Sequence, residues 1–489
     1  MALMPSTLLT IRLYRPTAPS RSYVFAAMCS LLQFESNVVH ALLLLNYELT
    51  IFCASDVQKF VHPMYNFCMV DDSGYVKRPL AEVLGQAKRK VVVLEGARAV
   101  GKTMMVREQL VPQGYSYVSL ADANTYALAQ VDIRGWLAQL KLPVVIDEAQ
   151  RIKTLPLAVK ELVDSLDSGG PLIILTGSAL IDRKGLDGQD PLARRAQHYT
   201  MSPLTRREFE DDSASIVDDL WQADPDTNYD YALDRSDLYN LMAAGGFPDF
   251  SRHYTEYEDW EREQLIADDL RAVLGDTILP GEKLDLVIAG NIMNRLLTQP
   301  GGILNASALG SDLAIDRRTV DRYLGVFLRR FLVHALPNLR TAPNRQSVAR
   351  SKIHPVDTSL SVQTLLGKGR DPLTDPVAFG GILESFVVNQ IVPAVQWSHT
   401  HPDCFYWREG GAKPKEVDLV MLRRDQLVGV EVKSAAIVTR DDLRGLAALS
   451  KDPRFRRGYI VYTGTQIMRW PNNLWALPVS ALWRDGAFA

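Results

Sequence analysis

A glycine-rich loop between an apolar strand and a helix constrains the fold of this chain most. Residues 91–103 read Val-Val-Val-Leu-Glu-Gly-Ala-Arg-Ala-Val-Gly-Lys-Thr, the complete pattern G-x-x-x-x-G-K-[ST] after a run of β-branched residues. Glycines let successive backbone N–H groups turn toward phosphate oxygens at the start of a helix. The pattern therefore predicts a phosphate-binding loop made of Gly96, Ala97, Arg98, Ala99, Val100, Gly101, Lys102 and Thr103. We expect this loop to bind ATP, with Lys102 at the β- and γ-phosphates and the Thr103 hydroxyl on Mg²⁺.

Two further strands end in polar residues that suit the same chemistry. Residues 143–150 read Pro-Val-Val-Ile-Asp-Glu-Ala-Gln, an apolar run typical of a central parallel strand. Asp147 is placed to hold Mg²⁺, and Glu148 is the candidate base that activates the attacking water. The strand at 171–178 ends in Thr176 and Ser178, where we expect a sensor of the γ-phosphate, although Ser178 as the cap of a turn stays open. The alternation of strands and helices predicts an α/β fold with a doubly wound parallel sheet.

These motifs resemble those of bacterial and archaeal AAA-type ATPases. The similarity includes Ile-Asp-Glu-Ala-Gln at 146–150 and Leu-Thr-Gly-Ser-Ala at 175–179, and it extends over roughly residues 75–465. Members of that family carry a carboxy-terminal domain of unknown function. ATPase chemistry also needs a cation against the developing γ-phosphate charge. The candidates for this arginine finger, among which the sequence does not choose, are Arg194, Arg195, Arg206 and Arg207.

Composition limits the class of protein further. The net charge of −3 excludes a globally basic nucleic-acid coat, and four irregularly spaced cysteines suit a reducing cytoplasm. No apolar run in residues 1–62 approaches the length of a membrane span, so we expect no membrane partner. We interpret residues 1–68 as an N-terminal extension. Our hypothesis is that it is an over-extended reading frame whose true start is Met64 or Met69, and a small packed helical extension is the alternative.

The middle of the chain combines an acidic stretch with a basic one. We interpret residues 208–234 as a solvated acidic insertion and about 236–274 as a small helical lid. Residues 303–324 suggest two helices joined by a turn, as in a winged-helix module. Nine basic residues lie between positions 317 and 352 against one acidic residue, Asp321. This basic 317–352 stretch is a candidate DNA contact, and packing between domains is the alternative.

The C-terminal region holds a second set of charged residues. Strand alternation places Glu416 and Asp418 on one face of a strand, and Glu431 and Lys433 on one face of the next. With Glu384 on a preceding helix, this order resembles the core of restriction-endonuclease-like proteins. That resemblance implies that Asp418 and Glu431 hold Mg²⁺ and that Lys433 acts on the attacking water. Three interpretations stay open: an active nuclease, a fold kept only for binding, and a simple Glu431–Lys433 ion pair.

We therefore expect five segments: an extension (1–68), an AAA-type ATPase core (69–205), the acidic insertion and helical lid (206–285), a winged-helix-like domain (286–375) and an endonuclease-like α/β domain (376–489). The predicted function is that of a cytoplasmic, Mg²⁺-dependent ATPase whose nucleotide state controls a DNA-directed C-terminal half. The alternative is a nucleotide-dependent switch whose C-terminal half is non-catalytic and binds a protein partner. A homo-oligomer is compatible with either.

Overall fold

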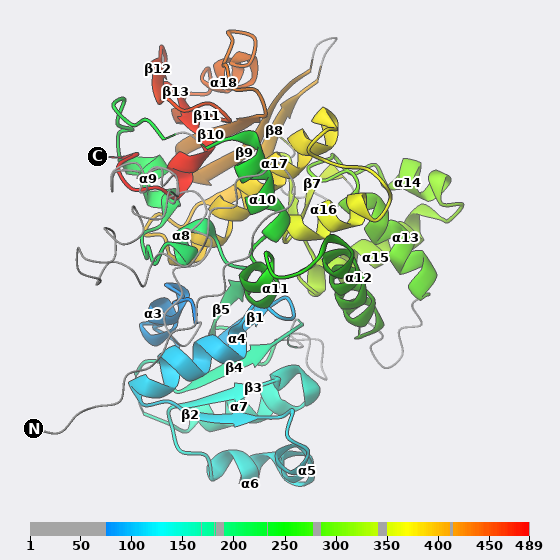
Figure 1. Cartoon of the computed structure of the whole chain (residues 1–489). Coiled ribbons are helices and arrows are strands. Elements are labelled where there is room, and N and C mark those ends of the chain that lie inside the picture. The colour runs from blue at the N-terminus through cyan, green and yellow to red at the C-terminus, as the bar shows by residue number, and fades with distance from the viewer. Residues whose placement is uncertain are drawn as a thin grey trace, which may run out of the picture. The chain divides into compact units, whose positions relative to one another are not determined.

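The computed structural model describes residues 75–488, apart from positions 168, 180, 182–189, 232, 277–284, 341–349 and 411–413. The predictions for the N-terminal extension, and for Arg345 in the basic stretch, therefore lie outside the described residues. Figure 1 shows the course of the chain.

The strands are β1 (Val91–Gly96), β2 (Ser116–Ser119), β3 (Val144–Asp147), β4 (Ile173–Gly177), β5 (Ala196–Met201), β6 (Val333–Leu336), β7 (Lys352–Pro355), β8 (Asp403–Glu409), β9 (Lys415–Arg423), β10 (Gln426–Lys433), β11 (Phe455–Tyr462), β12 (Met468–Trp470) and β13 (Leu474–Pro478). The α-helices are α3 (Leu80–Gly85), α4 (Lys102–Met105), α5 (Ala123–Val131), α6 (Ile133–Ala138), α7 (Leu155–Asp164), α8 (Arg206–Phe209), α9 (Ile216–Gln222), α10 (Arg235–Ala244), α11 (Pro248–His253), α12 (Asp259–Asp276), α13 (Leu286–Leu297), α14 (Ala306–Asp312), α15 (Arg317–Arg329), α16 (Thr358–Leu366), α17 (Pro376–Ile391) and α18 (Arg444–Leu449).

The first sheet has five parallel strands in the order β2-β3-β4-β1-β5. Every residue of β1 is buried because helices cover both faces of the sheet. Leu80 of α3 and Met105 of α4 pack on one face, while Val159 of α7 packs on the other. This confirms the predicted parallel α/β architecture and brings the carboxyl ends of β1, β3 and β4 to one edge.

The second sheet is mixed, with six strands in the order β12-β13-β11-β10-β9-β8. Strands β8, β9 and β10 are antiparallel, and β11 pairs parallel to β10. Helix α17 packs on one face through Leu383 and Val387, and α18 packs on the other through Leu446 and Leu449. The order helix, three strands, helix, strand is the one expected from the sequence. Its assignment as endonuclease-like stays a prediction.

In the part of the chain that connects the two sheets, helices α13 to α15 are followed by the antiparallel strand pair β6–β7. This order agrees with a winged-helix layout, and that assignment also stays a prediction. One continuous hydrophobic cluster runs from Ile216 to Ala487 and includes residues of the expected lid, winged-helix and endonuclease-like segments. These segments therefore share one core in the structure.

The interpretation of residues 208–234 as a solvated insertion is wrong. Helix α9 buries Ile216, Val217, Leu220 and Trp221 in the common core. Asp219 pairs with the buried Arg207 at 2.6 Å. The acidic composition did not indicate that α9 is buried, because a short helix can pack when only one of its sides is apolar.

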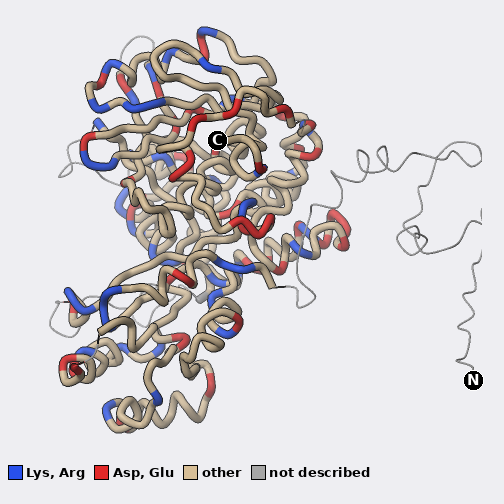
Figure 2. The backbone as a smooth tube through the Cα atoms, turned by 90° about the vertical axis from the view of Figure 1, so that its left-hand side faces the viewer, with Lys and Arg blue, Asp and Glu red and all other residues tan. Residues whose placement is uncertain are grey.

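Two other features of the fold are a long apolar helix and the distribution of charged residues. Among the described residues, one helical segment, Pro376–Trp397, is long and apolar enough to cross a membrane, and 67% of its apolar window is buried in the protein, as expected of a core helix. Figure 2 shows basic and acidic residues interspersed along the chain on the face in view, in keeping with the small net charge of −3.

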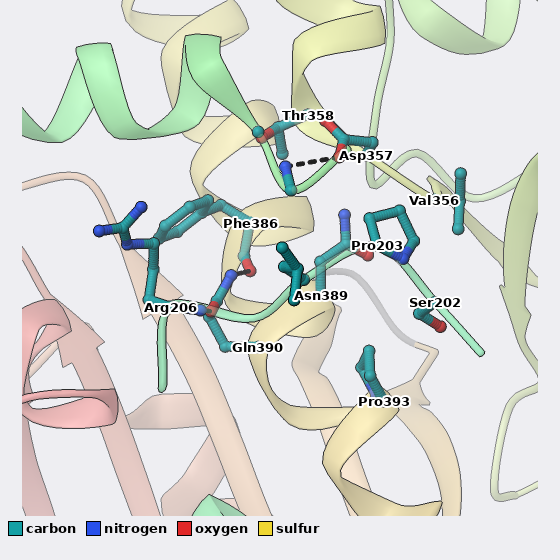
Figure 3. A pocket seen from close by; sticks show the side chains of 13 residues that line it. Ser202, Pro203, Arg206, Val356, Asp357, Thr358, Phe386, Asn389, Gln390 and Pro393 are labelled. Atoms are coloured by element: carbon teal, nitrogen blue, oxygen red, sulfur yellow. Dashed lines mark hydrogen bonds between the residues drawn. The ribbon is translucent and has the colours of Figure 1, made fainter. Parts of the chain in front are cut away.

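A small cavity lies where the segment 202–206 meets α16 and α17 (Figure 3). Its volume of about 10 Å³ is room for about one water molecule. Asp357 at its edge accepts hydrogen bonds from the backbone N–H groups of Gly246 (2.7 Å) and Phe247 (3.0 Å). We regard this cavity as a packing junction and place the functional site elsewhere.

Candidate functional site

The phosphate-binding loop closes tightly between β1 and α4. A Cβ on Gly96 would lie 2.2 Å from the Met201 carbonyl oxygen, so only glycine fits there. Gly101 has φ of 92°, a left-handed conformation that glycine adopts without strain. The Lys102 ammonium is buried and donates to the carbonyl oxygens of Gly96 (3.0 Å) and Ala97 (2.7 Å). Burial lowers the pKa of Lys102 to about 8, although the carboxylates of Glu148 and Asp147 act to raise it.

Asp147 is the polar centre of this edge of the sheet. Its Oδ2 atom accepts hydrogen bonds from the hydroxyls of Thr103 and Tyr117, each at 2.8 Å. Its Oδ1 atom accepts from the Thr176 hydroxyl and from the Glu148 N–H. The structure thus brings the two predicted Mg²⁺ residues, Thr103 and Asp147, together. Hydroxyl and carboxylate oxygens are ligands that Mg²⁺ prefers, so this pair fits the ion.

Glu148 is positioned by its backbone and by one neighbour. Its φ of 56° is left-handed, an uncommon conformation for a residue with a side chain. Gln150 Nε2 donates to Glu148 Oε2 and, at 3.2 Å, to the Ser178 hydroxyl. The candidate base and the candidate sensor are therefore joined through Gln150. Sequence reasoning missed Tyr117 because it lies outside the motifs that identified the site, and it gave no role to Gln150, the last residue of the Ile-Asp-Glu-Ala-Gln segment.

Another missed residue is Arg78, which buttresses the phosphate-binding loop. Its buried guanidinium donates to the carbonyl oxygens of Val100 (3.0 Å) and Ser202 (2.6 Å) and pairs with Glu208 at 2.9 Å. Glu208 in turn forms a capping box with Thr205 at the start of α8. No short motif marks Arg78, since its partners lie 22 and more residues away in the chain.

The four arginine-finger candidates differ in their engagement. Arg195 pairs with Asp164 at 2.6 Å, and Arg206 is buried beside Phe209. Arg207 donates to the Leu482 carbonyl oxygen at 2.8 Å. Arg194 is exposed and forms no ion pair with the part of the chain described. Of the four candidates Arg194 alone is exposed, and the identity of the arginine finger stays a prediction.

The second site is a buried charge cluster around Lys352, at the start of β7. Its Nζ atom lies 2.6 Å from Asp418, 2.7 Å from Glu416 and 2.8 Å from Glu384. Although burial opposes it, these three carboxylates hold the pKa of Lys352 well above its usual value. Burial, reinforced by the Asp418 charge, raises the pKa of Glu384. We call these four residues the Lys352 cluster.

Glu431 and Lys433 lie next to this cluster. Lys433 Nζ lies 2.5 Å from Glu431 Oε1, and Asp418 Oδ2 accepts a hydrogen bond from the Val432 N–H at 2.8 Å. The buried Glu431 Oε2 atom has no hydrogen-bond partner among the residues that the structure describes. Strand alternation was therefore a sound guide to which charged residues meet, but it could not reveal that Lys352 joins them from another part of the chain.

The Lys352 cluster as arranged does not fit a divalent metal ion. Its three carboxylates already surround one ammonium group, and no group of three or more His, Cys, Asp or Glu among the described residues is disposed to hold a metal. The prediction that Lys352 contacts DNA as part of the basic 317–352 stretch is wrong, because its side chain is buried and fully paired.

Three family models match separate parts of the chain. Residues 88–210 match the model described as an AAA domain. Residues 235–371 and 379–482 match two models described as domains of unknown function, DUF8612 and DUF4143. Residues 88–210 are therefore similar to AAA domains, and they contain the nucleotide motifs whose geometry is described above. No curated protein matches the chain.

Solved structures offer only distant likenesses. A Walker-type ATPase of Pyrococcus abyssi is 14% identical, covers 61% of this chain and 99% of its own, and gives a TM-score of 0.35. The RuvB Holliday junction branch migration motor of Thermotoga maritima is 16% identical, with coverage of 54% and 88% and a TM-score of 0.25. A signal transduction ATPase of Pyrococcus horikoshii with a tetratricopeptide repeat sensor is 10% identical, with coverage of 66% and 49% and a TM-score of 0.20. Such low scores carry no argument about function.

Proposed function

We propose that this chain is a Mg²⁺-dependent ATP hydrolase that works as a nucleotide-dependent switch. The observation that supports this proposal most strongly is that four residues lie together at one edge of the parallel sheet, namely Lys102, Thr103, Asp147 and Glu148. Lys102, now bonded to loop carbonyls, would exchange these for phosphate oxygens. Thr103 and Asp147 would hold Mg²⁺, whose charge offsets that of the β- and γ-phosphates.

Glu148 is the proposed general base in this scheme. Its carboxylate would orient a water molecule toward the γ-phosphate and accept its proton. Gln150 holds that carboxylate beside Ser178, the residue we propose to contact the γ-phosphate. Because the backbone of Glu148 and its hydrogen bond from Gln150 already position the base, ATP binding would need little rearrangement there.

A pair of substitutions tests this proposal. Glu148→Gln should keep ATP binding and lower steady-state turnover by roughly 10²- to 10⁴-fold, the usual contribution of a general base. Lys102→Ala should lose both binding and turnover. Lys153→Ala, an exposed lysine beyond the site, is the matched control and should behave as the wild type. Turnover that survives Glu148→Gln would assign the activity to another site or to a contaminant.

For the C-terminal half we propose a binding role rather than metal-dependent cutting in the arrangement described. The supporting observation is the Lys352 ammonium, which lies among the carboxylates that a nuclease would use for Mg²⁺. The competing proposal, a nuclease with Asp418, Glu431 and Lys433 as its catalytic residues, predicts Mg²⁺- or Mn²⁺-dependent nicking of plasmid DNA. Nicking that disappears in Asp418→Ala and Lys433→Ala would establish the nuclease and remove our version.

We further propose that nucleic acid is the partner that the C-terminal half binds. Helices α14 and α15 lie in sequence across a short turn, and α15 exposes Arg317, Arg318 and Arg322. Exposed arginines on the second helix of such a pair suit phosphate contacts. A protein partner is the alternative, and DNA-independent ATP turnover together with absent DNA binding would favour it.

A further inference from the structure

We infer that a cleft lined by Arg317, Arg350 and Arg408 binds the phosphodiester backbone of nucleic acid. The cleft has a volume of about 440 Å³, and its wall also includes Asn305 and Ser307. That volume lies within the usual range of ligand sites. This inference deepens the proposed nucleic-acid partner by assigning it a site, and it requires nothing of the ATPase domain.

Three separate parts of the chain bring these arginines together. Arg317 begins α15, Arg350 precedes β7, and Arg408 lies in β8. The Leu304 N–H donates to the Ser351 carbonyl oxygen at 2.9 Å, which fixes the start of α14 beside β7. The Tyr406 hydroxyl donates to the Arg350 carbonyl oxygen at 2.9 Å, which fixes β8 beside the same segment. The cleft is therefore built from regular structure on three sides.

The charges around the cleft leave it electropositive. Arg317 lies 3.5 Å from Asp321, and Arg408 lies 3.6 Å from Glu416. Arg350 forms no ion pair with the part of the chain that the structure describes. Three guanidinium groups thus face two carboxylates, and both pairs are long and partly exposed. Such pairs contribute little free energy, so a phosphate can replace the carboxylate at small cost.

Guanidinium groups are suited to phosphate in particular. Their planar forks can donate two parallel hydrogen bonds to one phosphate, which an ammonium cannot do. A guanidinium group in general also stays charged across the physiological pH range. A cleft of three arginines, with no lysine in its wall, therefore points to phosphate recognition.

A polymer fits better than a small anion because α15, which contributes Arg317 to the cleft, also exposes two further arginines outside it. Arg318 and Arg322 are exposed on α15, four residues apart and so on one side of the helix. A free phosphate would occupy only the cleft. A nucleic-acid strand would place successive phosphates on the cleft and then on α15, with one counterion released for each contact.

The test is fluorescence anisotropy with a labelled 30-base-pair DNA, at several salt concentrations, with EDTA and without ATP. For the full chain we expect binding whose affinity falls steeply with salt. The double variant Arg350→Ala/Arg408→Ala should bind on the order of a hundredfold more weakly, about tenfold per arginine, as charge-assisted hydrogen bonds are lost. The slope of log Kd against log salt should fall by about one for each arginine removed.

The matched control is Arg271→Ala, since Arg271 is an exposed arginine of α12 that pairs with Asp268 away from the cleft. It should leave the affinity and the slope unchanged. Equal weakening in Arg271→Ala and the double variant would overturn the site. Inorganic phosphate that displaces the DNA from the wild type at a concentration close to that of DNA phosphate would show a small-anion site and overturn the polymer. No binding by the wild type would overturn the proposed partner itself, while the ATPase proposal would stand.

Discussion

The Nζ atom of Lys352 lies 2.6 Å from Oδ1 of Asp418, although 66 residues separate them in the chain. Each of these buried charges depends on the other for compensation. The relationship joins β7 to β9 and ties the segment before α16 to the mixed sheet. It is also the contact on which we base the proposal of binding rather than cutting in the C-terminal half.

Replacing Lys352 should destabilise the protein strongly. Lys352→Met leaves the buried Asp418 carboxylate and the partly buried carboxylates of Glu384 and Glu416 without their cation, and breaking a buried pair costs roughly 3–5 kcal/mol. Lys415→Met is the matched control because Lys415 is exposed and 3.9 Å from its partner Glu409. Urea unfolding of both variants measures the difference. Equal stability of the two would contradict the account of the Lys352 cluster.

Removing the ammonium should also expose a latent cation site. In the absence of nucleotide we expect Mn²⁺ to raise the melting temperature of Lys352→Ala, and to leave that of the wild type nearly unchanged. At a hundredfold excess over its Kd, a bound ion stabilises by about 2.7 kcal/mol. The double variant Lys352→Ala/Asp418→Asn should lose the effect. An equal Mn²⁺ shift in the wild type that also requires Asp418 would show that Lys352 does not fill the site.

ATP affinity should weaken above pH 8. Burial lowers the pKa of Lys102 to about 8 in the free protein, whereas bound phosphate favours the charged ammonium. Binding then takes up a proton at higher pH, so the apparent Kd should rise toward about tenfold per pH unit above pH 8 and stay level just below it. Lys102→Arg, which does not titrate in this range, should bind with no such rise. Titration calorimetry across pH 7 to 9.5 gives the comparison.

Tyr117 should matter for Mg²⁺ through Asp147. The Tyr117 hydroxyl donates to Asp147 Oδ2 at 2.8 Å, and its loss leaves that carboxylate less firmly oriented. Residues that donate a hydrogen bond to a metal ligand usually affect metal affinity by roughly 10- to 100-fold. The Tyr117→Phe variant should therefore need about tenfold more Mg²⁺ for half-maximal turnover. Tyr115→Phe is the control, since its hydroxyl reaches only the Pro171 carbonyl oxygen at 3.4 Å. Matching Mg²⁺ curves for the two variants would exclude this role.

The sequence predicted the parallel sheet and the geometry of the phosphate-binding loop well because their signals are local. Strand β1, the loop from Gly96 to Thr103 and the acidic end of β3 each lie within one short segment, and parallel topology brings the segments to one edge. The residues that hold these segments in place could not be predicted from the sequence. Arg78, Tyr117 and Gln150 each donate hydrogen bonds to residues far away in the chain, which no spacing rule encodes.

The C-terminal half shows the opposite balance. Alternation along β9 and β10 grouped Asp418, Glu431 and Lys433 as the structure does, whereas the count of basic residues from 317 to 352 assigned Lys352 to a basic surface stretch. The division into lid, winged-helix and endonuclease-like segments also missed the single core shared by Ile216 and Ala487. Burial depends on contacts between distant segments, and a local pattern does not contain them.

Steady-state ATP hydrolysis by the purified chain, with Glu148→Gln and Lys102→Ala in parallel, tests the central claim most directly. The account predicts Mg²⁺-dependent turnover in the wild type, retained ATP binding with at least a hundredfold lower turnover in Glu148→Gln, and neither in Lys102→Ala. Addition of double-stranded DNA should raise the wild-type rate if the two halves are coupled. Turnover unchanged by Glu148→Gln, or ATP binding unchanged by Lys102→Ala, would contradict it.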